Sequence, residues 1–202
     1  MKKNLLFAFF LIQITCLSAQ KGAFEFGVNG GINVSSAVNF KENRLHHWDM
    51  KPLKGIQLGV TFGYRFNDFY SFRLGINLER RGFKDSTYLN GHSRFFPGVD
   101  EYTSGYVSIP LLNEFHFLNH HLIASVGVDF AKDFYEDGNE FGIIAGIGTG
   151  FNITQRMKWR LDVKFNRGLK DWRYHTDYFY LDGLKTFNIS TGLIYSFEKK
   201  KK

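Results

Sequence analysis

The last patterned stretch of the chain reads Ser190-Thr191-Gly192-Leu193-Ile194-Tyr195-Ser196-Phe197, and only a charged tail follows it. Successive side chains of an extended strand point to opposite faces, so Leu193, Tyr195 and Phe197 share one face. Small and polar residues, among them Ser190 and Ser196, occupy the other face. The stretch therefore predicts a β-strand that is apolar and aromatic on one side and polar on the other.

Seven earlier stretches alternate in the same way. Apolar residues take every second position in them, which is typical of a strand with two unlike faces. A tilted transmembrane strand needs about 9–11 residues, so these stretches have the length required to cross a bilayer. The eight predicted strands cover residues 24–35, 56–66, 70–79, 107–117, 122–130, 141–153, 159–166 and 186–197.

The connections between these strands alternate between short and long. Outer-membrane barrels combine an even number of strands with short periplasmic turns and long extracellular loops. We therefore predict an all-β fold, an eight-stranded antiparallel up-and-down transmembrane β-barrel with both termini in the periplasm. Tight turns are predicted at residues 67–69, 118–121 and 154–157, and long loops at 37–54, 85–104, 132–140 and 170–185.

The final strand also matches the signal with which such barrels end. A polar residue, a glycine and two aromatic residues spaced by two are typical of this signal, here Ser190, Gly192, Tyr195 and Phe197. The match predicts the barrel-assembly machinery as a partner during insertion.

The N-terminus has the residue order of a secretory signal peptide. Lys2 and Lys3 precede an apolar run from Leu5 to Ile12, and the small residues Ser18 and Ala19 follow. The run is shorter than the ~20 residues that a transmembrane helix requires. We predict a signal peptide at 1–19, the outer-membrane barrel domain at 20–198 and a basic tail at 199–202.

The charge of the chain does not indicate a nucleic acid partner. The formal net charge is +7, and removal of Lys2 and Lys3 with the signal peptide lowers it to +5. Lys199 to Lys202 account for four of the remaining positive charges. The barrel domain itself is therefore nearly balanced, and we predict no nucleic acid binding.

The apolar face is predicted to meet lipid and the polar face to line the lumen. Aromatic residues make up 18% of the chain and gather at both ends of the apolar face, as in the girdles of membrane barrels. The polar face carries charges of both signs, which must pair in a narrow lumen because desolvation penalises an isolated ion. We predict a lumenal ion-pair network of Glu25, Arg65, Arg73, Glu79, Glu114, Asp129, Arg160, Asp162 and Lys164.

A soluble lipocalin-like periplasmic binding barrel is the structural alternative, because it also has eight strands and an apolar face. That face would point inward around a ligand. The glycines on the polar face and the banding of the aromatic residues favour the membrane barrel.

The fourth predicted strand contains Pro110, which removes a donor from the strand ladder, and we expect a β-bulge there. The surrounding string Tyr106-Val107-Ser108-Ile109-Pro110-Leu111-Leu112 resembles a strand of the PorT-like outer-membrane β-barrel proteins of Bacteroidetes. The opening Phe26-Gly27-Val28-Asn29-Gly30-Gly31 and the signal ending in Ala19-Gln20 are similar to the same family. The resemblance implies an eight-stranded outer-membrane barrel and an accessory role beside a secretion apparatus.

No catalytic site can be assembled from the sequence. The chain has seven histidines, but no pair has a metal-ligand spacing on a regular element, and no serine, histidine and acid fall together. We predict no enzyme activity, metal or cofactor, and eight strands leave little room for a pore. An outer-membrane lipid-modifying enzyme and a small-solute channel are the alternatives.

Two contact surfaces are predicted at the extracellular side of the cell outer membrane, besides the lipid itself. Arg80, Lys84 and Arg167 lie on the apolar face at strand ends, where their cations could pair with lipopolysaccharide phosphates. Arginines that snorkel from the membrane edge are the alternative. Aromatic loop residues predict a protein or glycan partner, unless they pack on one another. These residues are Trp48, Trp172, Tyr174, Tyr178 and Tyr180.

The membrane barrel predicts a heat-modifiable band on gels. Unheated protein from washed outer membranes should migrate differently from boiled protein, because a closed barrel with all backbone groups paired resists unfolding in detergent. The gel mobilities of heated and unheated samples measure this. A soluble periplasmic band without a shift would instead indicate the lipocalin-like barrel.

Overall fold

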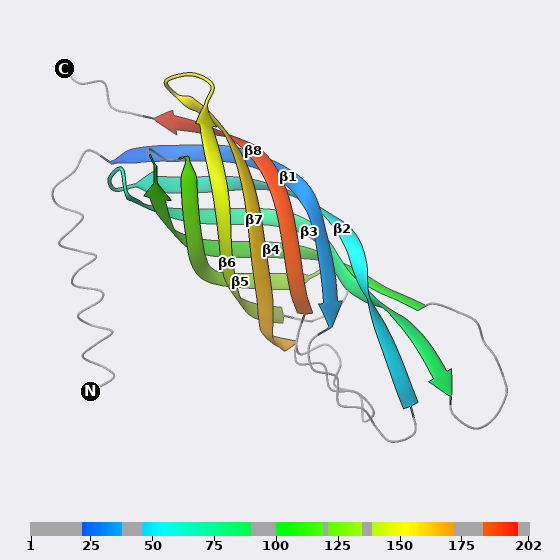
Figure 1. The fold of residues 1–202 in the computed structure, drawn as a ribbon. Coiled ribbons are helices and arrows are strands. Elements are labelled where there is room, and N and C mark those ends of the chain that lie inside the picture. Colours follow the sequence, from blue (N-terminus) through cyan, green and yellow to red (C-terminus); the bar gives the residue numbers. More distant parts are fainter. Residues whose placement is uncertain are drawn as a thin grey trace, which may run out of the picture.

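The structure is a computed structural model that describes residues 22–37, 46–89, 100–118, 121–134, 139–171 and 184–197. Its strands form a closed barrel in which each strand pairs with the next (Figure 1). The predicted eight-stranded antiparallel all-β barrel is thereby confirmed. The strands are β1 (Ala23–Ala37), β2 (His46–Arg65), β3 (Tyr70–Leu89), β4 (Asp100–Phe117), β5 (Leu122–Asp133), β6 (Asn139–Asn152), β7 (Met157–Asp171) and β8 (Leu184–Phe197).

Pairing of the first and last strands closes the barrel. β8 runs antiparallel to β1, with Phe197 opposite Phe24 at one end and Leu184 opposite Ala37 at the other. This pairing satisfies backbone groups of both strands that lipid could not satisfy. The predicted signal peptide and basic tail lie outside the described residues, among which no helix is long and apolar enough to cross a membrane.

Side chains alternate between the outer face and the lumen. On β1, Val28 and Ile32 are 50% and 60% exposed, whereas Glu25 and Asn33 are 5% and 1% exposed. Many large apolar side chains of the barrel wall are exposed, and most buried side chains are polar or charged. This distribution is the reverse of the lipocalin-like alternative, in which the apolar face would line the lumen.

The two ends of the barrel differ, and we name them by their connections. The turn end carries residues 66–69 and 153–156 together with Leu118 and His121, and the loop end lies opposite. Asn67 Oδ1 accepts hydrogen bonds from the backbone N–H groups of Phe69 and Tyr70, at 2.9 and 2.7 Å. Such side-chain acceptors stabilise tight turns. The short connections after β2 and β6 confirm the turns that were predicted there.

The predicted loops 37–54 and 85–104 are too long. β2 already begins at His46, β3 continues to Leu89 and β4 begins at Asp100. At the loop end of the described side chains the polarity of the two faces inverts: Leu53 and Phe83 point inward and are 3% and 5% exposed. The sequence prediction followed apolar residues on one face only, so it ended these strands too early.

The β-bulge expected at Pro110 is wrong. Residues 74–77 of β3 and 108–111 of β4 keep one register on both sides of the proline. Gly75 faces it, and a Cβ added to Gly75 would lie 2.8 Å from the Pro110 Cγ. The glycine leaves room for the ring, so the strand absorbs the proline without a shift. The register shifts occur at 52/57 of β2 and at 141/142 of β6.

We expect Gly127→Ala to destabilise the barrel more than Gly63→Ala. A Cβ on Gly127 would lie 1.8 Å from the carbonyl oxygen of Leu111, whereas a Cβ on Gly63 would meet its nearest neighbour at 3.4 Å. Overpacking of this kind costs about 1–3 kcal/mol. Urea unfolding of both variants in micelles measures the difference, and equal midpoints would contradict it.

Candidate functional site

The lumen contains two clusters of charged side chains. The turn-side cluster lies near the turn end, and the loop-side cluster lies nearer the loop end. The turn-side cluster contains Glu25, Arg65, Arg73, Glu114, Arg160, Asp162 and Lys164. The loop-side cluster contains Glu79, Arg81, Asp129 and Glu140.

Arginines link the carboxylates of the turn-side cluster. Arg160 binds Glu114 through two N–H groups, at 2.7 and 3.1 Å, and its Nε donates to Asp162 at 2.8 Å. Arg73 Nη2 lies 3.2 Å from Glu114 and 3.6 Å from Glu25. A bidentate arginine–carboxylate pair is among the strongest side-chain contacts. The arginines therefore compensate buried carboxylates that would otherwise be costly.

The remaining contacts of the turn-side cluster are simple pairs. Arg65 pairs with Glu25, and Lys164 Nζ lies 3.9 Å from Asp162. All seven residues of this cluster were among the predicted lumenal network. The structure brings them together near one end of the lumen, whereas the predicted Glu79 and Asp129 lie in the loop-side cluster.

Arg81 organises the loop-side cluster. Its side chain is fully buried and contacts three carboxylates: Glu79 at 2.8 Å, Asp129 at 2.8 Å and Glu140 at 3.3 Å. Asn166 donates a further hydrogen bond to Asp129 at 2.5 Å. The sequence analysis missed Arg81 and Glu140, because both lie beyond the predicted ends of their strands. Their positions, two residues from Glu79 and Gly142 respectively, would have placed them on the lumenal face.

Uncharged polar side chains occupy the β1, β2 and β8 side of the lumen. Asn33, Gln57 and Asn188 are 1%, 3% and 3% exposed. Glycines admit these amides: a Cβ on Gly55 would lie 2.4 Å from the Asn33 Oδ1. The lumen is thus filled by side chains, as expected for eight strands.

An apolar plug covers the loop-side cluster. It consists of Phe83, Tyr106, Ala131 and Leu184, all buried and in mutual contact. The Arg81 guanidinium carbon lies 5.4 Å from the centroid of the Tyr106 ring, a cation–π distance. The plug removes the loop-side ion pairs from solvent, so their electrostatic contacts act in a low-dielectric setting.

A serine and a histidine meet in the turn end of the lumen, a contact that the sequence analysis did not find. Ser71 Oγ lies 2.7 Å from His116 Nε2 and 3.2 Å from a Glu114 oxygen. Such a pair can activate a serine only where a substrate can reach it. Ser71 is 1% exposed, and the cavity beside His116 measures about 10 Å³, which is room for one water.

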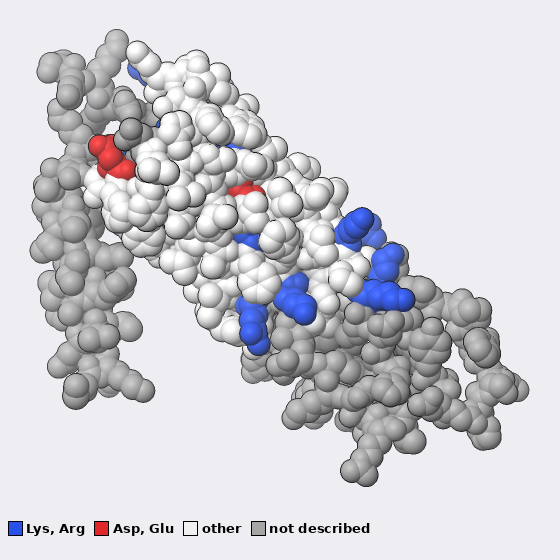
Figure 2. Space-filling model, viewed as in Figure 1, with Lys and Arg blue, Asp and Glu red and all other residues white. Residues whose placement is uncertain are grey.

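Cations gather on the outer face at the loop end. Figure 2 shows blue atoms at one end of a largely white barrel wall. The predicted Arg80 and Lys84 lie there on β3, and Arg167 lies on β7, four strands away. Arg80 Nε donates to Thr103 Oγ1 at 2.8 Å. The three predicted residues therefore do not form one site. The outer cations with described side chains are Lys51, Lys54, Arg80, Lys84, Lys132, Arg167 and Lys185.

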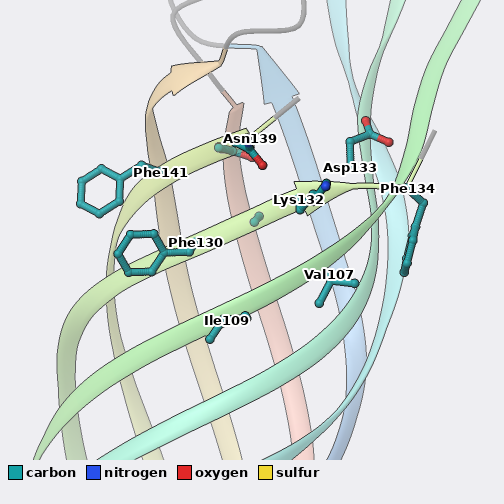
Figure 3. Close-up of a pocket in the computed structure, with 10 residues that line it drawn as sticks. Val107, Ile109, Phe130, Lys132, Asp133, Phe134, Asn139 and Phe141 are labelled. Carbon is teal, nitrogen blue, oxygen red and sulfur yellow. The ribbon is translucent and has the colours of Figure 1, made fainter. Parts of the chain in front are cut away.

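A shallow groove of about 610 Å³ lies at the loop end of β4, β5 and β6 (Figure 3). Phe130 and Phe141, with ring centroids 5.1 Å apart, form part of its apolar lining. Val107 and Ile109 continue this lining on β4, and Lys132 lies at the groove as well. The groove is therefore a continuation of the apolar outer wall rather than a polar site.

The other predicted site residues are those of the assembly signal and those of the loop surface. Within the assembly signal, Ser190 is buried and Phe197 is exposed, and the Tyr195 and Phe197 ring centroids lie 4.8 Å apart. Among the residues that the structure describes, no group of histidines and acids could hold a metal ion. Outside the described side chains lie the predicted loop surface residues Trp48, Trp172, Tyr174, Tyr178 and Tyr180.

We expect Arg81→Met to destabilise the barrel by about 3–5 kcal/mol, because it leaves three buried carboxylates without their shared cation. The matched control is Arg80→Met, one residue away on the outer face, where an exposed cation contributes about 1 kcal/mol or less. Urea unfolding in micelles measures both. A loss as large for Arg80→Met as for Arg81→Met would contradict the role of Arg81.

The fold is shared with solved outer-membrane proteins. The outer membrane protein OprG from Pseudomonas aeruginosa is similar with a TM-score of 0.56 and 14% identity, over 87% of this chain and 96% of that one. The outer membrane protein AlkL, solved in DMPC bilayers, has a TM-score of 0.56 and 12% identity, over 91% of this chain and 93% of that one. No curated protein matches the sequence.

The sequence itself matches a family model. The model is that of the outer membrane protein beta-barrel domain, and the match covers residues 18–173. The matched segment exceeds half of the 202 residues. The apolar outer wall, the closed lumen and this match agree, and the chain belongs to the outer-membrane β-barrel domain family and resides in the outer membrane.

Proposed function

We propose that this protein is a non-enzymatic integral outer-membrane barrel that binds a partner at its extracellular end, in a structural or accessory role. The loop end is extracellular in this proposal, because short turns face the periplasm in such barrels. The observation that carries the proposal is a projecting sheet formed by β2, β3 and β4. Figure 1 shows β2 and β3 reaching beyond the ends of the other strands.

Strand lengths and pairing define the projecting sheet. β2 and β3 have 20 residues each and β4 has 18, whereas β5 has 12. β1 pairs with β2 only as far as Leu53, and β5 pairs with β4 only as far as Tyr106. Among the described residues, segments 46–50 and 100–104 therefore have their strand partner on β3, and the β4–β5 contact ends where the Phe134 N–H donates to the Gly105 carbonyl oxygen at 2.9 Å.

Two open strand edges suit the addition of a partner strand. An edge presents backbone N–H and C=O groups in a row, and extended peptides bind such edges by joining the sheet. Pro52 lies at the inner end of one edge, where it limits pairing to the outer part. The partner class that fits is a protein with an extended segment.

The lumen supports the non-enzymatic part of the proposal. The carboxylates of its two clusters are bound to arginines, and its Ser71–His116 contact has no space for a substrate. The plug of Phe83 and Tyr106 also argues against the channel alternative. The string around Pro110 supports a place among PorT-like proteins of Bacteroidetes, and with it an accessory role beside a secretion apparatus.

We expect a shortened hairpin to lose its partner while the barrel still folds. Deletion of residues 46–51 together with 84–89 removes six complete β2–β3 pairs and so keeps the register of the rest. A photo-crosslinker at exposed Thr103 of β4 should give a protein adduct in intact cells of the native host. The adduct should disappear in the shortened variant.

Two controls accompany this experiment. A crosslinker at Val126, in the middle of the apolar band, should give no protein adduct, and heat-modifiable migration reports folding of every variant. Deletion of residues 172–180 tests the fourth loop separately. An adduct that persists in the shortened hairpin but is lost with the loop would assign the contact to the loop instead.

A further inference from the structure

The outer face of β7 and β8 changes character in three successive cross-strand pairs. The first pair is aliphatic, the second aromatic and the third cationic. This order matches the depth profile of a membrane leaflet, in which aromatic residues lie at the interface and cations lie at the headgroups. The pairs are Val163–Ile189, Phe165–Phe187 and Arg167–Lys185.

The third pair places two cations directly opposite each other. Arg167 and Lys185 are partners in the β7–β8 ladder, and both side chains are exposed. Like charges at directly opposite positions destabilise a sheet. Among the described residues, neither side chain has a hydrogen bond or ion pair. An anion held between them would convert this repulsion into attraction.

The same spacing occurs on a third strand. Lys132 follows the girdle residue Phe130 by two positions on β5, as Arg167 follows Phe165 on β7. Lys132 and Arg167 both point outward and are exposed. On β5, β7 and β8, an exposed cation therefore lies two residues beyond an aromatic residue of the girdle, towards the loop end.

Acids are absent from the outer face at this level among the described side chains. Described carboxylates at the loop end, such as Asp129, Asp133 and Glu140, are buried. The described carboxylate that is exposed, Asp68, lies at the turn end. At the loop end, the described carboxylates thus point inward around Arg81, whereas the described charges on the outer face are cations. The outer surface at this level fits an anionic ligand.

We propose that Arg167 and Lys185 together bind one phosphate of lipid A, the glycolipid part of lipopolysaccharide in the outer leaflet. Arginine matches phosphate geometry with two parallel N–H donors, and the opposite lysine adds a second charge. The phosphates of lipid A lie at the boundary between acyl chains and sugars, which is the depth of this pair. Of the predicted lipopolysaccharide contacts, Arg167 belongs to this site, whereas Arg80 and Lys84 lie on the other side of the barrel.

Binding of purified diphosphoryl lipid A to the full chain in neutral detergent tests the proposal. Native mass spectrometry counts the lipid A molecules bound per barrel as a function of concentration. The double variant Arg167→Gln with Lys185→Gln should bind at least about tenfold more weakly, because two charge-assisted contacts are lost. The conservative variant Lys185→Arg should bind like the wild type.

Arg156→Gln is the matched control, since Arg156 is an exposed arginine in the β6–β7 turn at the opposite end. Its variant should bind lipid A as the wild type does, and heat-modifiable migration should show that every variant folds. Unchanged binding by the double variant would overturn the proposal. Equal loss in Arg156→Gln, or equal competition by phosphatidylglycerol, would also overturn it, because either result indicates attraction to anionic lipid in general.

Discussion

Closure of the sheet is the constraint on which the other features depend. Hydrocarbon offers no hydrogen bonds, and each unpaired backbone group there costs several kcal/mol. β8 therefore has to return to β1, and its pairing runs along β1 from Phe24 to Ala37. Closing only eight strands leaves a narrow lumen. Inward positions must then be glycines, small polar residues or ions with partners close by.

The charges of the barrel are sorted by the wall and by depth. The turn-side cluster holds four cations and three acids, whereas the loop-side cluster holds three acids around Arg81. The excess of acid in the lumen thus lies at the end where the outer surface is cationic. Lipid phosphates can compensate the outer cations, and Arg81 compensates the inner acids. At the loop end of the barrel, anions outside would therefore compensate the cations of the outer face, and a cation inside compensates the acids of the lumen.

The wall changes its chemistry where it extends beyond the aromatic girdle. Below that level the apolar side chains face outward to lipid, and above it Leu53, Phe83 and Tyr106 turn inward as a buried core. Water surrounds the outer part of such a barrel, so hydrophobic burial there favours an apolar interior. This inversion lets β2, β3 and β4 continue as a sheet outside the membrane and seals the lumen in the same step.

The period of two in the sequence by itself determined the number of strands and the face on which each charge lies, because side-chain direction in a strand depends only on position. It did not determine which charges pair. Arg81 and Arg73 have the same lumenal direction, yet they join different clusters, since register and depth decide the partners. The opposition of Arg167 and Lys185 likewise arises from strand pairing between residues 18 positions apart. Such contacts are set by closure of the barrel, which no local pattern encodes.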